Sequence, residues 1–359
     1  MKCNQYLLLF MTFFTSLQST LSLSVKLSKI TQRVRHTRLS SSTYSLLMET
    51  PIQIRGLAEI ADRYDLFLFD QFGVLHDGVK PVDGTISMLN ELRKLNKTAV
   101  IVSNTSSRSA VAANRLNEIG FPSSSFDGGV VTSGESAHKW INNLCVEEGP
   151  RKCCFITWRD GKAYSAHGAN SFLSSLQVNI ASPEDADFIC FHGTQNLANA
   201  DPTLEGTPID LYIDGNVNEK VIRGCLEVAA SRQLPAVCAN LDMIAMVPSG
   251  AAYMPGLLKE SYESMGGTCV GFGKPNRDHF TSAVEMASIV HRKKYGISEN
   301  VKLRALHIGD SIHHDIAGKI IHYHSFFYSS IHLFVCLFDF LFINMLSSCI
   351  TLIMCHQMN

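Results

Sequence analysis

The chain has 359 residues, of which 46% are hydrophobic, and a formal net charge of −1. This length accommodates two domains with separate cores, and the near-neutral balance excludes a basic surface for nucleic acid. The 11 cysteines include no CxxC pair and several lie inside apolar runs, which argues against a zinc site and favours buried thiols over disulfides.

Residues 1–49 form a leader that lacks the composition of a folded domain. The first 48 residues contain no Asp or Glu but are rich in Ser and Arg, which is typical of a plastid or mitochondrial transit peptide. Two other interpretations stay open. The apolar stretch Tyr6–Phe14 also fits a secretory signal, although the cysteine pattern disfavours secretion, and translation from Met48 would give a cytoplasmic protein.

Short apolar runs bounded by Gly, Asp, Asn or Pro recur between residues 50 and 318, and each predicts a strand. Apolar residues at helical spacing predict helices at Thr85–Leu95 and Asn276–Tyr295. Because strands alternate with helices, we expect an α/β fold with a parallel sheet covered on both faces. The predicted strands are Asp65–Phe69, Thr98–Val102, Gly129–Thr132, Cys153–Thr157, Asp187–Phe191, Pro235–Ala239, Thr268–Phe272 and Ala305–Ile308.

Polar residues that could act together follow four of these apolar runs. Asp70 ends the first strand, Ser103-Asn104 end the strand TAVIVSN, Lys274 lies in GFGKPN, and GDSIHHD carries Asp310 and Asp315. In an open parallel sheet, ligands bind where strands end at their carboxyl edge. One lysine and one hydroxyl can hold a phosphoryl group, carboxylates suit Mg²⁺, and a carboxylate nucleophile can form an aspartyl-phosphate.

These segments resemble the haloacid dehalogenase-like hydrolase superfamily, and more narrowly its class IIA branch of nitrophenyl-phosphate, phosphoglycolate and pyridoxal phosphate phosphatases. The resemblance implies a Rossmann-like core, residues 50–107 and 272–318, interrupted by an α/β cap of the C2 type at residues 108–271. The motifs that carry it are DQFGVLHDG (70–78), IVSNTS (101–106), TSGE (132–135), ANLD (239–242), GKPN (273–276) and GDSIHHDIAG (309–318).

The resemblance also implies roles for individual residues. Asp70 and Lys274 would be catalytic. Mg²⁺ would be held by Asp70, Asp310, Asp315 and the backbone carbonyl of Phe72.

The implied substrate is a small phosphorylated metabolite. Ser103 and Asn104 would bind its phosphate, and Asn240 and Asp242 of the cap would contact the leaving group. The resemblance further implies a homodimer formed through the cap. Separately, we interpret His313 and His314 as surface residues.

Phe72 departs from the family pattern, which has an acid two residues after the nucleophile. That acid protonates the leaving oxygen and activates water, and general acid–base help is worth roughly 10²–10⁴-fold. His76 and Asp77 are candidate substitutes. The alternative functions are a weak or inactive phosphate-binding module and a truncated splice form with little activity.

Residues 319–359 form a hydrophobic tail with almost no charge. Phe326–Cys355 is long enough to span a bilayer, although Asp339 would be costly there, so membrane association depends on the tail being genuine. We favour the hypothesis of a read-through intron or mis-predicted exon. On that hypothesis the core lacks an edge element at its C-terminal end, and the chain is poorly soluble.

Overall fold

The computed structural model describes residues 52–54, 56–159, 172–209, 219–247, 250–311, 314–315, 331–337 and 350–353. The predictions for the leader, a transit peptide or a start at Met48, concern residues outside these ranges. Across the described residues, no helix is long and apolar enough to cross a membrane.

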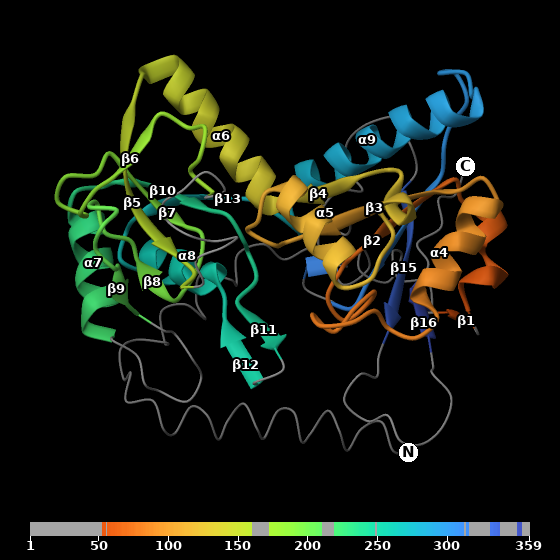
Figure 1. Cartoon of the computed structure of the whole chain (residues 1–359), viewed down its shortest axis with the longest axis horizontal. Coiled ribbons are helices and arrows are strands. Elements are labelled where there is room, and N and C mark those ends of the chain that lie inside the picture. Colours follow the sequence, from red (N-terminus) through yellow and green to blue (C-terminus); the bar gives the residue numbers. More distant parts are fainter. Residues whose placement is uncertain are drawn as a thin grey trace, which may run out of the picture. The chain divides into compact units, whose positions relative to one another are not determined.

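The core is built on a seven-stranded sheet with the order β1-β16-β15-β14-β2-β3-β4 (Figure 1). The strands from β15 to β4 pair in parallel, whereas β16 is antiparallel to both of its neighbours. The strand bounds are β1 Ile52–Ile54, β2 Leu66–Phe69, β3 Thr98–Ser103, β4 Val130–Thr132, β14 Ala305–Gly309, β15 Ile331–Leu337 and β16 Ile350–Ile353.

Helices cover both faces of this sheet because successive side chains of a strand point to opposite faces. Phe67 and Phe69 of β2 pack in one cluster with residues of α4 and α5, while Leu66 and Leu68 pack in another with residues of α9. The central strand is therefore buried on both sides, as an apolar run of this kind predicts. The helix bounds are α4 Thr85–Lys94, α5 Ser109–Glu118 and α9 Arg277–Tyr295.

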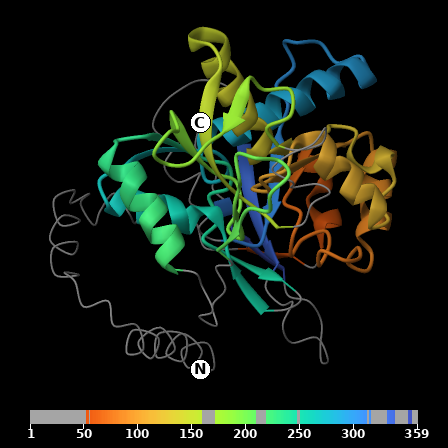
Figure 2. The same ribbon diagram turned by 60° about the vertical axis from the view of Figure 1, so that its left-hand side comes forward.

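The cap has its own sheet, which lies in the yellow-green to teal part of the ribbon in Figure 2. Its strand order is β13-β10-β7-β5-β8-β9, and β6 pairs with β5. Helix α6 packs on one face of it, and α7 and α8 pack on the other. A two-stranded hairpin of β11 and β12 extends away from this sheet in both views. The bounds are β5 Arg151–Thr157, β6 Val178–Ile180, β7 Phe188–Phe191, β8 Asn196–Leu197, β9 Thr207–Pro208, β10 Pro235–Cys238, β11 Ile244–Val247, β12 Gly250–Tyr253, β13 Thr268–Gly271, α6 Ser133–Glu148, α7 Glu219–Ser231 and α8 Pro255–Ser264.

The boundary between core and cap differs from the prediction at one end. We expected the cap to begin at residue 108, but β4 pairs with β3, so the chain stays in the core through Thr132. The Thr132 side chain then accepts a hydrogen bond from the Glu135 N–H and caps α6, which leads into the cap. At the other end, β13 pairs with β10, so the cap sheet continues to Gly271.

The eight predicted strands and both predicted helices are present within a residue or two of their expected bounds. The fold prediction, a Rossmann-like parallel sheet with an inserted α/β cap, is therefore confirmed. Its qualification, a core lacking an edge element, stays a prediction, and in the described part of the tail the sheet continues beyond β14. β15 lies beside β14 there, and β16 joins β15 to β1. The β-branched and aromatic residues of this segment favour strands, which the absence of a clear period had hidden.

We predict that the tail strands stabilise the core. A chain ending after residue 318 would lose β15 and leave the edge of β14 unpaired, so we expect a lower melting temperature and larger oligomers. Gel filtration and thermal unfolding would be compared with a chain ending after residue 337, which keeps β15. A shorter chain that is as stable and as monodisperse as the longer one would contradict the pairing.

Candidate active site

Three neighbouring parallel strands end at one place in the core. Asp70 follows β2, Ser103 is the last residue of β3, and Asp310 follows β14. β2 pairs with β14 on one side and with β3 on the other. The residues that sequence order alone singled out therefore meet at the carboxyl edge of the sheet, as expected for a ligand site in this type of fold.

The side chain of Lys274 lies at the centre of the site and is only 2% exposed. It follows the last strand of the cap, β13, and precedes α9. Its Nζ lies 2.9 Å from Asp70 Oδ2 and 2.7 Å from Asp315 Oδ1. Two carboxylates thus compensate one buried ammonium, which is the condition for burying such a charge.

Asp315 is fully buried and both of its oxygens accept hydrogen bonds from the protein. Oδ1 receives Lys274 Nζ and also His307 Nε2, which lies 2.9 Å away. Oδ2 accepts the backbone N–H of Ser311 at 3.0 Å. Asp315 therefore orients other groups of the site, and Asp70 and Asp310 have more room to bind a ligand directly.

The three carboxylates form a group that suits a divalent cation. Asp70, Asp310 and Asp315 each offer one oxygen, and these oxygens lie within 4.8 Å of one another. Mg²⁺ prefers oxygen ligands and retains several waters, so a partly open carboxylate set fits it. Gly73 brings the backbone that follows Phe72 against this group, because a Cβ at Gly73 would lie 2.1 Å from Asp310 Oδ2. The Phe72 carbonyl as a further ligand stays a prediction.

The charges of the site act on one another. Burial raises the pKa of Asp70 to about 8, against the opposing effect of Lys274, and Asp315 and Asp310 add to the rise. Loss of solvent and the Asp315 charge raise the pKa of Asp310 to about 6. Burial alone would raise the pKa of Asp315, but Lys274 and His307 hold it well below its usual range. Burial likewise opposes the charge of Lys274, yet Asp315 and Asp70 raise its pKa.

Asn104 holds the Lys274 segment in place. Its Oδ1 accepts the Lys274 N–H at 2.6 Å, and its Nδ2 donates to the Lys274 carbonyl at 3.0 Å. The neighbouring Ser103 hydroxyl oxygen accepts the Thr105 N–H at 3.2 Å. The predicted contacts of Ser103 and Asn104 with phosphate stay predictions, and the structure adds that the Asn104 amide orients the lysine.

The cap loop reaches the core through Asp242. Its Oδ1 accepts a hydrogen bond of 2.8 Å from Asn104 Nδ2 and lies 3.4 Å from His314 Nδ1. Asn240 is buried, and its Oδ1 accepts the Asp242 N–H at 2.7 Å, which shapes the turn. The interpretation of His314 as a surface residue is wrong, because it contacts the cap at the site. His313 lies outside the described residues.

Neither residue suggested as a substitute acid is suited to that role. Phe72 is 44% exposed and packs its ring edge-on against His76, with centroids 4.7 Å apart. His76 Nδ1 accepts the Gly78 N–H, and burial, with a contribution from Arg115, lowers its pKa to about 4. The Asp77 carboxylate accepts the N–H groups of the following turn. Both side chains therefore stabilise the loop.

Sequence reasoning missed His307. It lies in the middle of β14, a strand in which every residue is buried, and it contacts Asp315. The only signal was an imidazole inside an otherwise apolar strand, which one sequence cannot distinguish from an ordinary core histidine.

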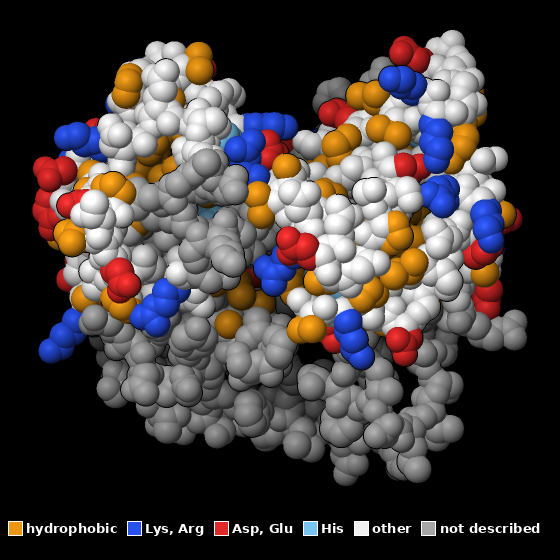
Figure 3. Space-filling view, in the orientation of Figure 1, with side chains coloured by type: hydrophobic (Ala, Val, Ile, Leu, Met, Phe, Trp, Pro, Cys, Tyr) orange, Lys and Arg blue, Asp and Glu red, His pale blue; other side chains and the backbone are white. Residues whose placement is uncertain are grey.

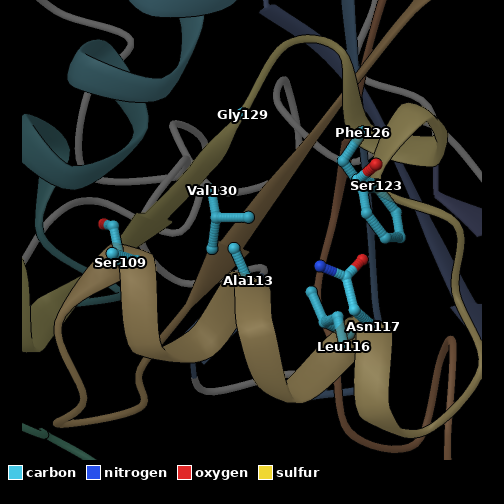
Figure 4. A pocket seen from close by; sticks show the side chains of 9 residues that line it. Ser109, Ala113, Leu116, Asn117, Ser123, Phe126, Gly129 and Val130 are labelled. Carbon is cyan, nitrogen blue, oxygen red and sulfur yellow. The ribbon is translucent and has the colours of Figure 1, made fainter.

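A separate surface pocket lies between α5 and the start of β4 (Figure 4). Its described lining, which includes Ala113, Leu116 and Phe126, contains no charged side chain. It shares no residue with the carboxylate site, and we assign it no function. On the face in Figure 3, acidic and basic side chains of the described residues are interspersed.

Comparison with known proteins supports the resemblance. Residues 67–170 match the family described as haloacid dehalogenase-like hydrolase. The chain is 43% identical over 63 residues to a 4-nitrophenylphosphatase of Schizosaccharomyces pombe, a match that spans 17% of this chain and only 21% of that relative. Because the match is short, the activity of that relative can be carried to this chain only as a proposal.

Solved structures agree with the fold. A haloacid dehalogenase-like hydrolase of Brucella suis 1330 is 25% identical, with a TM-score of 0.58 over 77% of this chain and 88% of that one. A possible sugar phosphatase of Cytophaga hutchinsonii, 22% identical, shares the fold with a TM-score of 0.55 over 75% and 86% of the two chains.

We predict that Mg²⁺ affinity rises with pH. The raised pKa values, about 6 for Asp310 and about 8 for Asp70, mean that these carboxyls hold protons which a cation must displace. Titration calorimetry in buffers of different ionisation enthalpy would measure both affinity and proton release. Equal affinities at about pH 5.5 and about pH 8.5, with no proton release, would contradict this arrangement of charges.

Proposed function

We propose that the chain, which matches the haloacid dehalogenase-like hydrolases over residues 67–170, is a Mg²⁺-dependent phosphoric monoester hydrolase acting on a small phosphorylated metabolite. The observation that carries the proposal is the buried ammonium of Lys274 between Asp70 and Asp315, at the ends of the central strands. A carboxylate, a cation and a hydroxyl at this edge suit transfer of a phosphoryl group.

In the first step, the Asp70 carboxylate attacks phosphorus and the bond from phosphorus to the leaving oxygen breaks. This step forms an aspartyl-phosphate and releases an alcohol once the leaving oxygen gains a proton. Lys274 offsets the negative charge on the phosphoryl oxygens, and the Ser103 hydroxyl is available to donate to one of them. A bound Mg²⁺ would neutralise phosphoryl charge and reduce the repulsion between substrate and nucleophile.

In the second step, water attacks phosphorus, the bond to Asp70 breaks, and inorganic phosphate leaves. Phe72 can neither protonate the leaving group of the first step nor activate this water. The first step should therefore favour leaving groups that depart without a proton, such as 4-nitrophenolate. The second step should be slow, so the aspartyl-phosphate should persist.

Phe72 also favours a second candidate function, a phosphate-binding module with little catalysis. The retention of Asp70 and Lys274 in direct contact argues for an enzyme, because a binding module has no need for a nucleophile. We also carry forward as proposals the leaving-group contact of the cap loop at Asn240 and Asp242, and a homodimer through the cap. An organellar or cytoplasmic location is likewise a proposal.

The first test of the proposal is Asp70→Asn. This change removes the nucleophile but nearly preserves its shape, so we expect Mg²⁺-dependent phosphate release from a panel of phosphate esters to fall to background. Asp83→Asn, at an exposed position, is the matched control and should retain full activity. If Asp70→Asn hydrolysed the same esters as fast as the unaltered protein, Asp70 would not be the nucleophile.

The second test is Phe72→Asp, which restores an acid beside the nucleophile. We expect the steady-state rate to rise by about 10²–10⁴-fold, with the larger gain for alkyl phosphates, because these need a protonated leaving group. Phe72→Leu controls for loss of the aromatic ring and should give no gain. A folded Phe72→Asp protein that binds Mg²⁺ but hydrolyses nothing would favour the binding module instead.

A further inference from the structure

His307 lies in the third position of β14 and is completely buried. Its side chain packs edge-on against Phe280 of α9, with ring centroids 5.1 Å apart. The flanking residues Leu306 and Ile308 point to the opposite face and join the other core cluster. An apolar side chain would satisfy this position in the core, so the imidazole needs a separate explanation.

Both ring nitrogens of His307 meet hydrogen-bond acceptors. Nδ1 lies 3.1 Å from the Leu68 carbonyl oxygen, and Nε2 lies 2.9 Å from Asp315 Oδ1. A carbonyl and a carboxylate only accept, so each ring nitrogen acts as a donor, as both do in the imidazolium form. The imidazole thereby connects Asp315 to the backbone of β2, two residues before Asp70.

This contact ends a continuous line of polar groups. His307 donates to Asp315, the same Asp315 oxygen receives Lys274 Nζ, and Lys274 also contacts Asp70. Asp315 can rotate only if it breaks these bonds. The line is buried except at Asp70, so solvent does not replace a lost partner, and a change at one end reaches the nucleophile.

We propose that His307 is a positioning residue which fixes the rotamer of Asp315 and, through it, the places of Lys274 and of the carboxylates that would hold Mg²⁺. The expected change in kinetics rests on the proposed function. The expected change in Mg²⁺ affinity does not. Groups that orient metal ligands from behind typically contribute about 10–100-fold to metal affinity or activity.

The two amide replacements separate the two bonds. Gln at position 307 can place its amide nitrogen near that of Nε2 and keep the bond to Asp315, whereas Asn can reproduce only the bond of Nδ1 to Leu68. We expect His307→Asn and His307→Leu to weaken Mg²⁺ binding, measured by calorimetry on the full chain, by about 10–100-fold. His307→Gln should recover most of the affinity. With 4-nitrophenyl phosphate the same order should appear in kcat, with a smaller change in KM.

His291→Leu is the matched control. His291 is also buried and its Nδ1 bonds the Thr98 hydroxyl at 3.0 Å, at the opposite end of β3 from the site. Its loss should lower the melting temperature without changing Mg²⁺ affinity. If all three His307 variants lowered only the melting temperature, as this control should, His307 would be a structural residue and the proposal would be overturned.

Phe280→Leu is the replacement test if neither amide variant folds. It leaves the imidazole of His307 in place but removes the aromatic ring that packs against it. That variant must then weaken Mg²⁺ binding several-fold, and unchanged affinity would overturn the proposal. If the unaltered chain binds Mg²⁺ but hydrolyses no ester, the proposed function fails, while the Mg²⁺ affinities of the His307 variants still decide this inference.

Discussion

The burial of the Lys274 ammonium between Asp70 and Asp315 is the constraint on which the rest of the structure depends. Removing one partner of such a buried group typically costs about 3–5 kcal/mol, because an unpaired charge is left behind. The three residues come from the end of β2, from the return of the chain out of the cap, and from the segment after β14. Closing this cluster therefore joins both halves of the core and fixes where the cap inserts.

The cap is tied to the same cluster through Asn104. One amide contacts the backbone of Lys274 and also the Asp242 carboxylate of the cap loop. A shift of the cap loop would thus act on the segment that carries Lys274. In the loop after Asp70, the rings of Phe72 and His76 pack on each other. This loop therefore places an aromatic ring, and no acid, two residues after the proposed nucleophile. On the proposed mechanism, this site can accept a phosphoryl group but lacks the acid that would help to release it.

Much of this could be predicted from the sequence. The strands were visible because apolar runs end abruptly at Asp70, Ser103 and Asp310, and strand ends determine where side chains meet. The assignment of β4 to the core was not visible, since a three-residue strand carries no sign of its partner. The roles of His307 and His314 depend on contacts made between distant segments, and in one sequence each is only a histidine near an apolar run or a turn.

The central claim is that Asp70 accepts a phosphoryl group and, beside Phe72, releases it slowly. The most direct measurement is acid quenching of the chain after incubation with Mg²⁺ and 4-nitrophenyl phosphate, followed by intact mass and peptide mapping. The account predicts one added phosphoryl group, on the peptide that contains Asp70, in a large fraction of the molecules. Steady hydrolysis with no phosphorylated protein, or a phosphoryl group on another residue, would contradict it.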